Sequence, residues 1–171
     1  MVLDPPDADY REVMPVKKKR MYFGHPLNTY DTPLEAELMA VIAKAFPDHE
    51  IVNPNRPEHQ RGYAEYEKTH KDVHGVPTGM GYFFEVLVPT CDAGVYLAFR
   101  DGMISAGCVG EAELQQGRGL PTWEITPDGV ITTLYAPLDP ARCLKRADTW
   151  ARLTDQKKEV LSTEKIIFKP Y

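Results

Sequence analysis

The stretch GVYLAFRDGMISAGCVGEAELQQG (residues 94–117) predicts a strand, a loop and a helix in succession. Residues 94–99 are almost continuously apolar, which is typical of a central strand covered on both faces. Residues 100–107 contain glycine and polar side chains and are expected to form a loop. A helix is predicted near residues 109–116, and Gly117 and Gly119 provide its stop signal. This order is typical of an α/β protein whose ligand crevice lies beyond the carboxyl ends of parallel strands.

The segments on either side repeat the pattern of strands alternating with helices. Residues 21–23 predict a short strand, and a helix follows with Asp31 or Thr32 as N-cap and Pro33 at its first position. Residues 50–52 predict a second strand, parallel to the first because a helix joins the two. Residues 121–125 predict a further strand. A turn at residues 126–129 then favours a hairpin with residues 130–134.

The remaining segments carry weaker signals. Residues 55–79 are polar, without a sustained apolar stripe, and are expected to form an excursion over the surface or the site. Helices are predicted over residues 79–91 and 139–153, the latter capped by Asp139, and a short strand over residues 166–168. Residues 1–16 show no period and predict an irregular arm, which leaves residues 17–171 as a single domain.

Composition excludes several classes of partner. The chain has 171 residues, 43% hydrophobic and 26% charged, with a net charge of −5, so it can bury a core but offers no basic face for polymeric nucleic acid or an anionic membrane. It contains no apolar run of membrane-spanning length and does not open on a signal-peptide pattern, which favours a cytoplasmic protein. Cys91, Cys108 and Cys143 are expected to be reduced thiols. His70 and His74 lack a third ligand, so no metal site is expected.

Two loops are candidates for chemistry. In the first, Tyr22 and Phe23 lead into Gly24, His25, Pro26, Leu27 and Asn28, where the glycine lets the backbone approach a ligand. In the second, small residues after the best strand bring Glu111 into the first turns of a helix, whose amides and the Ser105 hydroxyl could bind phosphate. Spacing alone leaves open that Gly24 to Pro26 is only a turn and that Glu111 merely complements the helix dipole.

The chain resembles a known family in three motifs that occur in the family's order. YFGHP (residues 22–26) resembles the Tyr-x-x-Gly-Pro signature of nucleoside 2-deoxyribosyltransferases and the related deoxynucleoside 5′-monophosphate N-glycosidases. CDAGVYLAFRDGMISAGCVGEAELQQGRGLPTWEI (residues 91–125) is similar to their strand, acidic loop, Gly-x-x-x-Glu helix and following Gly-x-Pro strand. The resemblance covers about residues 20 to 125. The alternation of strands and helices itself predicts an open, mostly parallel five-stranded sheet of the Rossmann or flavodoxin-like kind, with helices on both faces. The resemblance implies no cofactor and no metal.

The resemblance also implies catalytic roles. Glu111 matches the nucleophile that attacks the anomeric carbon and holds the sugar as an ester. Glu85 is the choice for the acid/base that protonates the departing base, although the family usually has Asp there and another register places Phe84 at that position. Tyr22 matches an aromatic residue that holds the nucleophile through its hydroxyl.

The implied ligand is a small nucleoside or nucleotide, and a homodimer or larger homo-oligomer is expected. Ser105 matches a phosphate-binding serine and favours a nucleotide, whereas His25 stands where proline often follows glycine. Asp101 is expected near the sugar or base, with a plain loop acid as the alternative, and Asp92 is either a site residue or a strand-entry residue. The expected ligand-binding positions are Gly24, His25, Pro26, Asn28, Asp101, Ser105, Gly107 and Gly110.

The reaction itself stays open. Attack by water on the glycosyl ester gives a hydrolase, and transfer to a second base gives a transferase. A non-catalytic nucleotide-binding module on the same fold is the main alternative, because fold does not decide function. A glycosidase acting on another nucleotide, such as a cofactor dinucleotide, is a third.

Overall fold

The computed structural model describes residues 15–154, which form one five-stranded sheet with the strand order β2-β1-β3-β4-β5. The first four strands in chain order run parallel, and β5 is antiparallel to β4. The strands are β1 (Lys19–Gly24), β2 (His49–Val52), β3 (Ala93–Leu97), β4 (Thr122–Ile125) and β5 (Ile131–Thr133). The predicted open, mostly parallel five-stranded α/β sheet is therefore confirmed.

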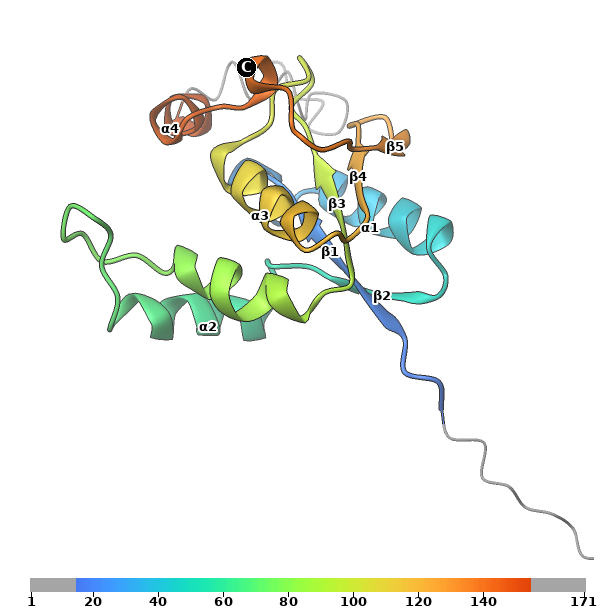
Figure 1. Cartoon of the computed structure of the whole chain (residues 1–171), viewed down its shortest axis with the longest axis horizontal. Helices are drawn as coiled ribbons and strands as arrows, with labels where there is room; N and C mark the ends of the chain where they lie inside the picture. The colour runs from blue at the N-terminus through green and yellow to red at the C-terminus, as the bar shows by residue number, and fades with distance from the viewer. Residues whose placement is uncertain (1–14, 155–171) are drawn as a thin grey trace, which may run out of the picture.

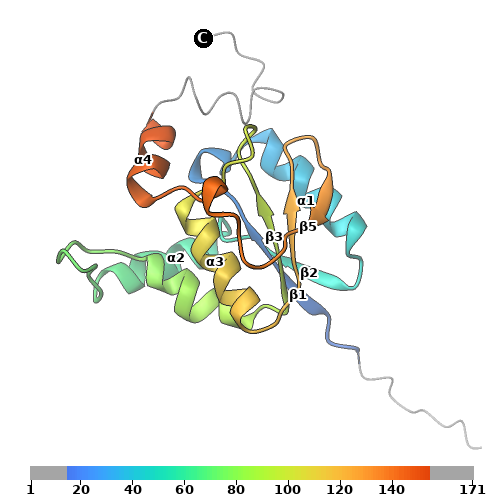
Figure 2. The same cartoon turned by 45° about the horizontal axis from the view of Figure 1, so that its top comes forward.

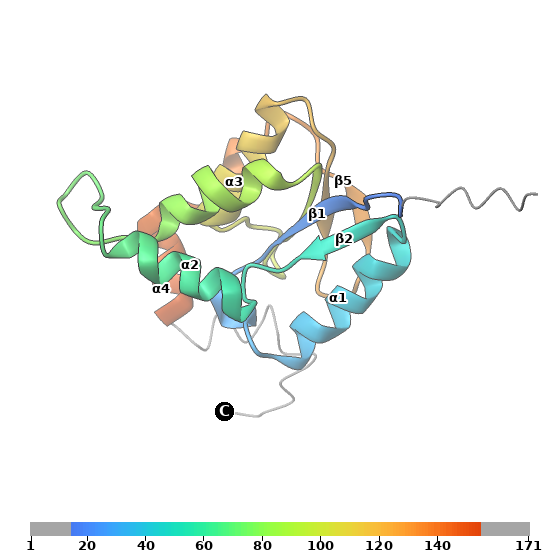
Figure 3. The same cartoon turned by 90° about the horizontal axis from the view of Figure 1, so that it is seen from below.

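Helices cover both faces of the sheet (Figures 1 and 3). Helix α1 packs on one face, and helix α3 packs on the other together with the π-helix η2. The helices are α1 (Pro33–Ala45), α2 (Pro57–Glu67), α3 (Ala106–Gly117) and α4 (Arg146–Thr154), with short helices η1 (Leu27–Thr29), η2 (Tyr82–Leu87), η3 (Val88–Thr90) and η4 (Pro140–Arg142). Among the described residues, none of these helices is long and apolar enough to cross a membrane.

Strand alternation explains the two-sided core. Met21 and Phe23 of β1 pack on the α1 face, whereas Tyr22 between them packs on the α3 face. In the same way Val95 of β3 packs on the α1 face and Tyr96 packs on the α3 face. Successive side chains of a strand point to opposite faces, so a strand covered on both sides is apolar throughout.

The two connections that involve β1 and β3 run to opposite sides of β1 in the sheet. From β1 the chain passes through α1 to β2 on one side, and from β2 it crosses back through α2 and η2 to β3 on the other. The carboxyl ends of these two neighbouring strands are the usual ligand position in such sheets.

Local sequence signals correctly predicted the first helix and the hairpin. Thr32, not Asp31, is the N-cap of α1, and its hydroxyl accepts a hydrogen bond from the Glu35 amide at 3.3 Å. Asp31 instead adopts the left-handed conformation with φ 59°. The β4–β5 hairpin turns through Gly129, which has φ 82°.

Other predictions need correction. The polar excursion contains α2, which was not predicted. Residues 79–91 form mainly the π-helix η2 and the 3₁₀-helix η3 instead of one regular α-helix. The single helix predicted over residues 139–153 is two, η4 and α4, because Ile104 pairs with the chain between them: its amide donates to Arg142 and its carbonyl accepts from Leu144. Residues 1–14 of the predicted arm and the predicted strand at 166–168 lie outside the described residues.

Candidate active site around Glu111

Glu111 and Tyr22 meet on the α3 face of the sheet. The Tyr22 hydroxyl donates a hydrogen bond to Glu111 Oε1 at 2.7 Å, although the two residues are 89 positions apart in the chain. Glu111 is 5% exposed and Tyr22 is fully buried. The contact that the resemblance implied between these two residues is therefore present.

The second carboxylate oxygen of Glu111 faces Gly24. A Cβ at Gly24 would lie 3.0 Å from Glu111 Oε2 and would overlap the ring of Tyr96, its neighbour across the strand pair. Tyr96 in turn donates a hydrogen bond to Gln115 at 2.7 Å. Glycine at position 24 thus gives the Tyr96 ring and the Glu111 carboxylate room to pack against β1.

Burial controls the protonation of Glu111. Removal from water raises the pKa of its carboxyl from 4.5 to about 8, and the hydrogen bond from Tyr22 only partly offsets this. Burial and the charge of Glu111 also raise the pKa values of Tyr22 and Tyr96. The folded protein therefore holds a mostly protonated Glu111 at neutral pH, surrounded by phenols that keep their protons.

Tyr30 is a site residue that sequence reasoning missed. It follows η1 in the loop after β1, and burial together with the charge of Glu111 raises the pKa of its phenol. Its ring packs against His25 with 4.8 Å between centroids. Its place in the loop after the first strand was the available signal.

Glu85 does not join Glu111. Its side chain is exposed and accepts a hydrogen bond from Tyr66 of α2. The ring of the preceding residue, Phe84, lies on α3, where a Cβ at Gly110 would be 2.9 Å from Phe84 Cε1. The structure thus brings Phe84, the residue of the other register, to the helix that carries the candidate nucleophile.

The groups expected to bind phosphate have partners within the protein. Ser105 is the N-cap of α3, and its hydroxyl accepts from the Cys108 amide at 3.4 Å. The Ala106 amide donates to the Thr149 hydroxyl of α4 at 2.9 Å, and Figure 2 shows α4 beside the start of α3. Gly107 is close to Met80, because a Cβ on this glycine would lie 3.7 Å from the Met80 methyl carbon. The Ala106 amide is therefore used within the protein, whereas the Ser105 hydroxyl keeps its own O–H as a hydrogen-bond donor.

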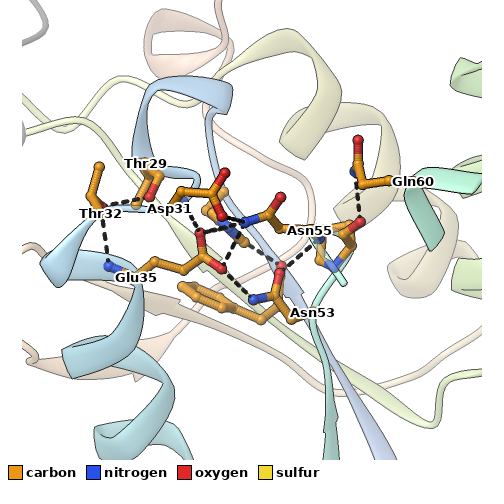
Figure 4. A network of polar contacts seen from close by, with 10 residues as sticks. Thr29, Asp31, Thr32, Glu35, Asn53, Asn55 and Gln60 are labelled. Atoms are coloured by element: carbon orange, nitrogen blue, oxygen red, sulfur yellow. Dashed lines mark hydrogen bonds and ion pairs between the residues drawn. The ribbon is translucent and has the colours of Figure 1, made fainter. Parts of the chain in front are cut away.

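A second buried carboxylate, Glu35, organises the loops after β1 and β2. Its carboxylate accepts hydrogen bonds from the Asp31 amide at 2.8 Å, from Asn53 at 2.6 Å and from Asn55 at 3.0 and 3.1 Å. Figure 4 shows these side chains converging on Glu35. His25 Nε2 lies 3.7 Å from Glu35 Oε2. Burial opposes ionisation of Glu35, but the hydrogen bonds outweigh it and hold its pKa at about 2.

This network fixes the first candidate loop. The His25 Nδ1–H donates to the Phe23 carbonyl at 2.9 Å, and the His25 ring stacks on Phe23 with 4.2 Å between centroids. Pro26 is buried, and Asn28 lies half-buried in η1. The structure thus brings His25 together with Phe23 and Glu35 at the carboxyl end of β1.

The two aspartates have different surroundings. Asp101, in the loop after β3, accepts two hydrogen bonds from Arg152 at 3.0 and 2.6 Å, which lower the pKa of its carboxyl. Asp92 accepts from the Arg20 amide at 2.8 Å at the start of β3. Asp92 is therefore a strand-entry residue, far from the carboxyl ends where the site lies.

A cavity of about 250 Å³ lies at the carboxyl ends of β3 and β4. Ala98, Phe99, Gly102 and Glu124 are among its lining residues, and Glu111 is not. Within residues 15–154, no three His, Cys, Asp or Glu side chains are placed to hold a metal ion. Cys91, Cys108 and Cys143 are free cysteines.

The chain was compared with protein families, curated proteins and solved structures. No family model matches the chain, and no curated protein matches it. A solved structure described as a conserved protein from Enterococcus faecalis V583 is similar over 85% of this chain and 80% of that chain, with 16% sequence identity and a TM-score of 0.43. The sheet order and its helical layers themselves define an α/β protein with an open, mostly parallel sheet.

Proposed function

We propose that the protein cleaves or transfers the N-glycosidic bond of a nucleoside, a deoxynucleoside or its 5′-monophosphate, with Glu111 as nucleophile. Glu111 attacks the anomeric carbon and forms a glycosyl ester, which water or an acceptor base then opens. Tyr22 positions the carboxylate through its hydroxyl. Residues from the loop after β1 contact the sugar and base.

The Tyr22–Glu111 hydrogen bond of 2.7 Å is the observation that supports this function. It joins two of the three sequence motifs, and Gly24 of the first motif packs against the other oxygen of the same carboxylate. A carboxylate held at the carboxyl end of a parallel sheet is suited to stabilise the oxocarbenium-like transition state of glycosyl transfer.

The raised pKa of Glu111 has a kinetic consequence. A nucleophile must be ionised, so kcat/KM is expected to increase with pH up to about 8, the pKa of the free protein's carboxyl. A decrease through the same pH range would mean that Glu111 acts as a proton donor instead.

The position of Glu85 favours the second candidate, a nucleotide-binding module without turnover. Its carboxylate is engaged with Tyr66 and is not available to protonate a base at Glu111. A protein of this kind would bind its ligand at the carboxyl ends of β1 and β3 and release no base.

The test is base release by the full chain. A panel of ribo- and deoxyribonucleosides and their 5′-monophosphates, with neutral and with N-alkylated bases, is incubated with and without an acceptor base and analysed by chromatography. Release is expected from the native protein and from Glu113→Gln, whose carboxylate is exposed on the same helix, and not from Glu111→Gln. No release from any member, together with a nucleotide-dependent increase in melting temperature, would establish the binding module.

A further inference from the structure

Helix α4 lies outside the apolar core of the protein. None of its nine residues is buried, and within residues 15–154 both apolar core clusters form without a residue of α4. Figures 1 and 2 show the helix at the edge of the molecule, apart from the strands. An isolated helix of this length is marginal in water, so its contacts with neighbouring segments decide where it lies.

Two of these contacts hold the loop after β3 and the start of α3. The Ala106 amide donates a hydrogen bond to the Thr149 hydroxyl at 2.9 Å. Arg152 donates to both carboxylate oxygens of Asp101, at 3.0 and 2.6 Å, and its guanidinium lies 5.0 Å from the centre of the Phe99 ring. Thr149 and Arg152 are three positions apart and therefore share one side of α4.

The ion pairs of α4 are in contact with water. The Asp101 side chain, which pairs with Arg152, is 52% exposed. At the first turn of α4, Arg146 donates to Asp72 at 3.2 Å, and the Arg146 side chain is 64% exposed. Exposed ion pairs are weak, because water and salt screen both charges. Helix α4 is therefore held less firmly than α1 and α3, which pack on the sheet.

The chain immediately before α4 is fixed to the core. Leu138 is buried in the cluster on the α3 face. The Ile104 amide donates to the Arg142 carbonyl at 2.7 Å, and the Leu144 amide donates to the Ile104 carbonyl at 2.9 Å. Lys145 is exposed and lies between this fixed segment and the start of α4. It is the position at which α4 can turn while the preceding residues stay in place.

We propose that α4 is a hinged lid over the start of α3, which opens about Lys145 while the sheet and its helices stay folded. In the closed lid, Thr149 and Arg152 engage the Ala106 amide and the Asp101 carboxylate. Opening exposes both of these groups to water or to a ligand, at the edge of the sheet where ligands usually bind. The proposal concerns a motion of the chain and does not depend on the proposed function.

Hydrogen exchange of the full chain, followed by NMR for each amide, tests the lid. The Ala106 amide donates to α4, so its exchange reports the open state. Val95, which lies in the middle of β3 and is fully buried, reports the core. Relative to their intrinsic rates, we expect Ala106 and the amides within α4 to exchange at least about 100-fold faster than Val95, because local opening costs less than global unfolding.

Arg152→Gln weakens the closed lid by removing the ion pair with Asp101. It should increase exchange of the Ala106 amide and of the α4 amides by the same factor, roughly 5-fold, which is the upper range for an exposed ion pair. Arg61→Gln, at an exposed arginine of α2, is the control and should leave these rates unchanged. Raising the salt concentration to about 1 M should increase opening of the native lid more than that of Arg152→Gln.

Thr149→Val removes the hydrogen-bond acceptor and keeps the shape of the side chain. It should increase exchange of the Ala106 amide more than exchange of the α4 amides, because Ala106 loses its partner in the closed lid as well. Thr154→Val is the matched control, since the Thr154 hydroxyl donates to the Trp150 carbonyl within α4. This control should leave the Ala106 rate within about 2-fold of the native value.

Three results would overturn the lid. The first is exchange of Ala106 at the protected rate of Val95, which would mean that α4 leaves only when the whole protein unfolds. The second is an unchanged Ala106 rate in Arg152→Gln. The third is an equal increase at Ala106 and Val95 in that variant, which would indicate global destabilisation. Base release plays no part in these measurements, so failure of the lid and failure of the proposed function are distinguishable.

Discussion

Replacement of Glu111 by glutamine is expected to stabilise the folded protein increasingly as pH rises. The amide has nearly the shape of the carboxyl and can accept the Tyr22 hydrogen bond, but it does not titrate. The native carboxyl, in contrast, is held at a pKa of about 8 by burial, compared with 4.5 in water. Between these values the unfolded chain has lost the Glu111 proton while the folded protein keeps it.

The sign and size follow from proton linkage. The unfolded state binds fewer protons than the folded state in this interval, so the free energy of unfolding of the native protein decreases as pH rises from 4.5 to about 8. The interval is about 3.5 pKa units, and at about 1.4 kcal/mol per unit the accumulated loss is at most about 5 kcal/mol. Glu111→Gln does not titrate and so does not lose this stability. At the upper end of the pH interval we expect its free energy of unfolding, relative to the native protein, to have increased by on the order of 3 to 5 kcal/mol.

Urea unfolding of both proteins across pH 4.5 to 8 measures this effect. The decisive quantity is the change with pH of the difference between them, because any fixed cost of the amide cancels. Glu113→Gln, exposed on the same helix, is the control and should follow the native protein at every pH. A constant difference between Glu111→Gln and the native protein over the whole interval would refute the assignment of a buried, protonated Glu111.

Three further results are expected. Tyr22→Phe removes a hydrogen bond that lowers the pKa of Glu111, so the pH at which kcat/KM levels off should increase. A hydrogen bond to a charged group is worth about 1.5 kcal/mol or more, so kcat/KM at neutral pH should decrease roughly 10-fold, and an unchanged profile would contradict this. Glu35→Gln should lower the free energy of unfolding by about 2 kcal/mol above pH 4.5, a figure that allows for partial contact of Glu35 with solvent. This loss should fade as pH drops toward 2, because the pKa of Glu35 in the folded protein lies below its value in the unfolded chain. Urea unfolding at both ends of that pH range tests it. Gly94→Ala places a methyl group in the space of the Gln115 and Tyr96 side chains and should destabilise the folded protein by about 2 kcal/mol or more. Gly117→Ala has open space around it and should leave the stability unchanged or increase it by up to about 1 kcal/mol. Equal melting temperatures for the two variants would contradict this.

Elements with local signals could be predicted from the sequence. Proline at the first position of α1 with a threonine cap, the apolar run of β3 and the turn chemistry before β5 each depend on residues near one another in the chain. Helix α2 also begins with a proline, Pro57, and has Glu58 in its first turn, but it buries no residue and lacks an apolar stripe, so the pattern that predicted α1 was incomplete here. The break between η4 and α4 depends on pairing with Ile104, some 40 positions earlier, which no local pattern can indicate.

The candidate site divides in the same way. The resemblance of the motifs was enough to place Tyr22 with Glu111 as a hypothesis. The choice between Phe84 and Glu85 was not open to sequence reasoning, because a π-helix has a wider turn than an α-helix and rotates its side chains out of the expected phase.

The sequence by itself therefore determined the alternation of β1, α1, β2, β3, α3 and β4 and the burial of β3 on both faces, since these follow from short-range propensity and period. The pairing of Tyr22 with Glu111 was implied by the resemblance of the motifs. Only the tertiary structure decided the protonation of Glu111, the ionisation of Glu35 and the aromatic surface at Gly110. These depend on burial and on partners from distant segments, and the free energy of a charge is set by its complete surroundings.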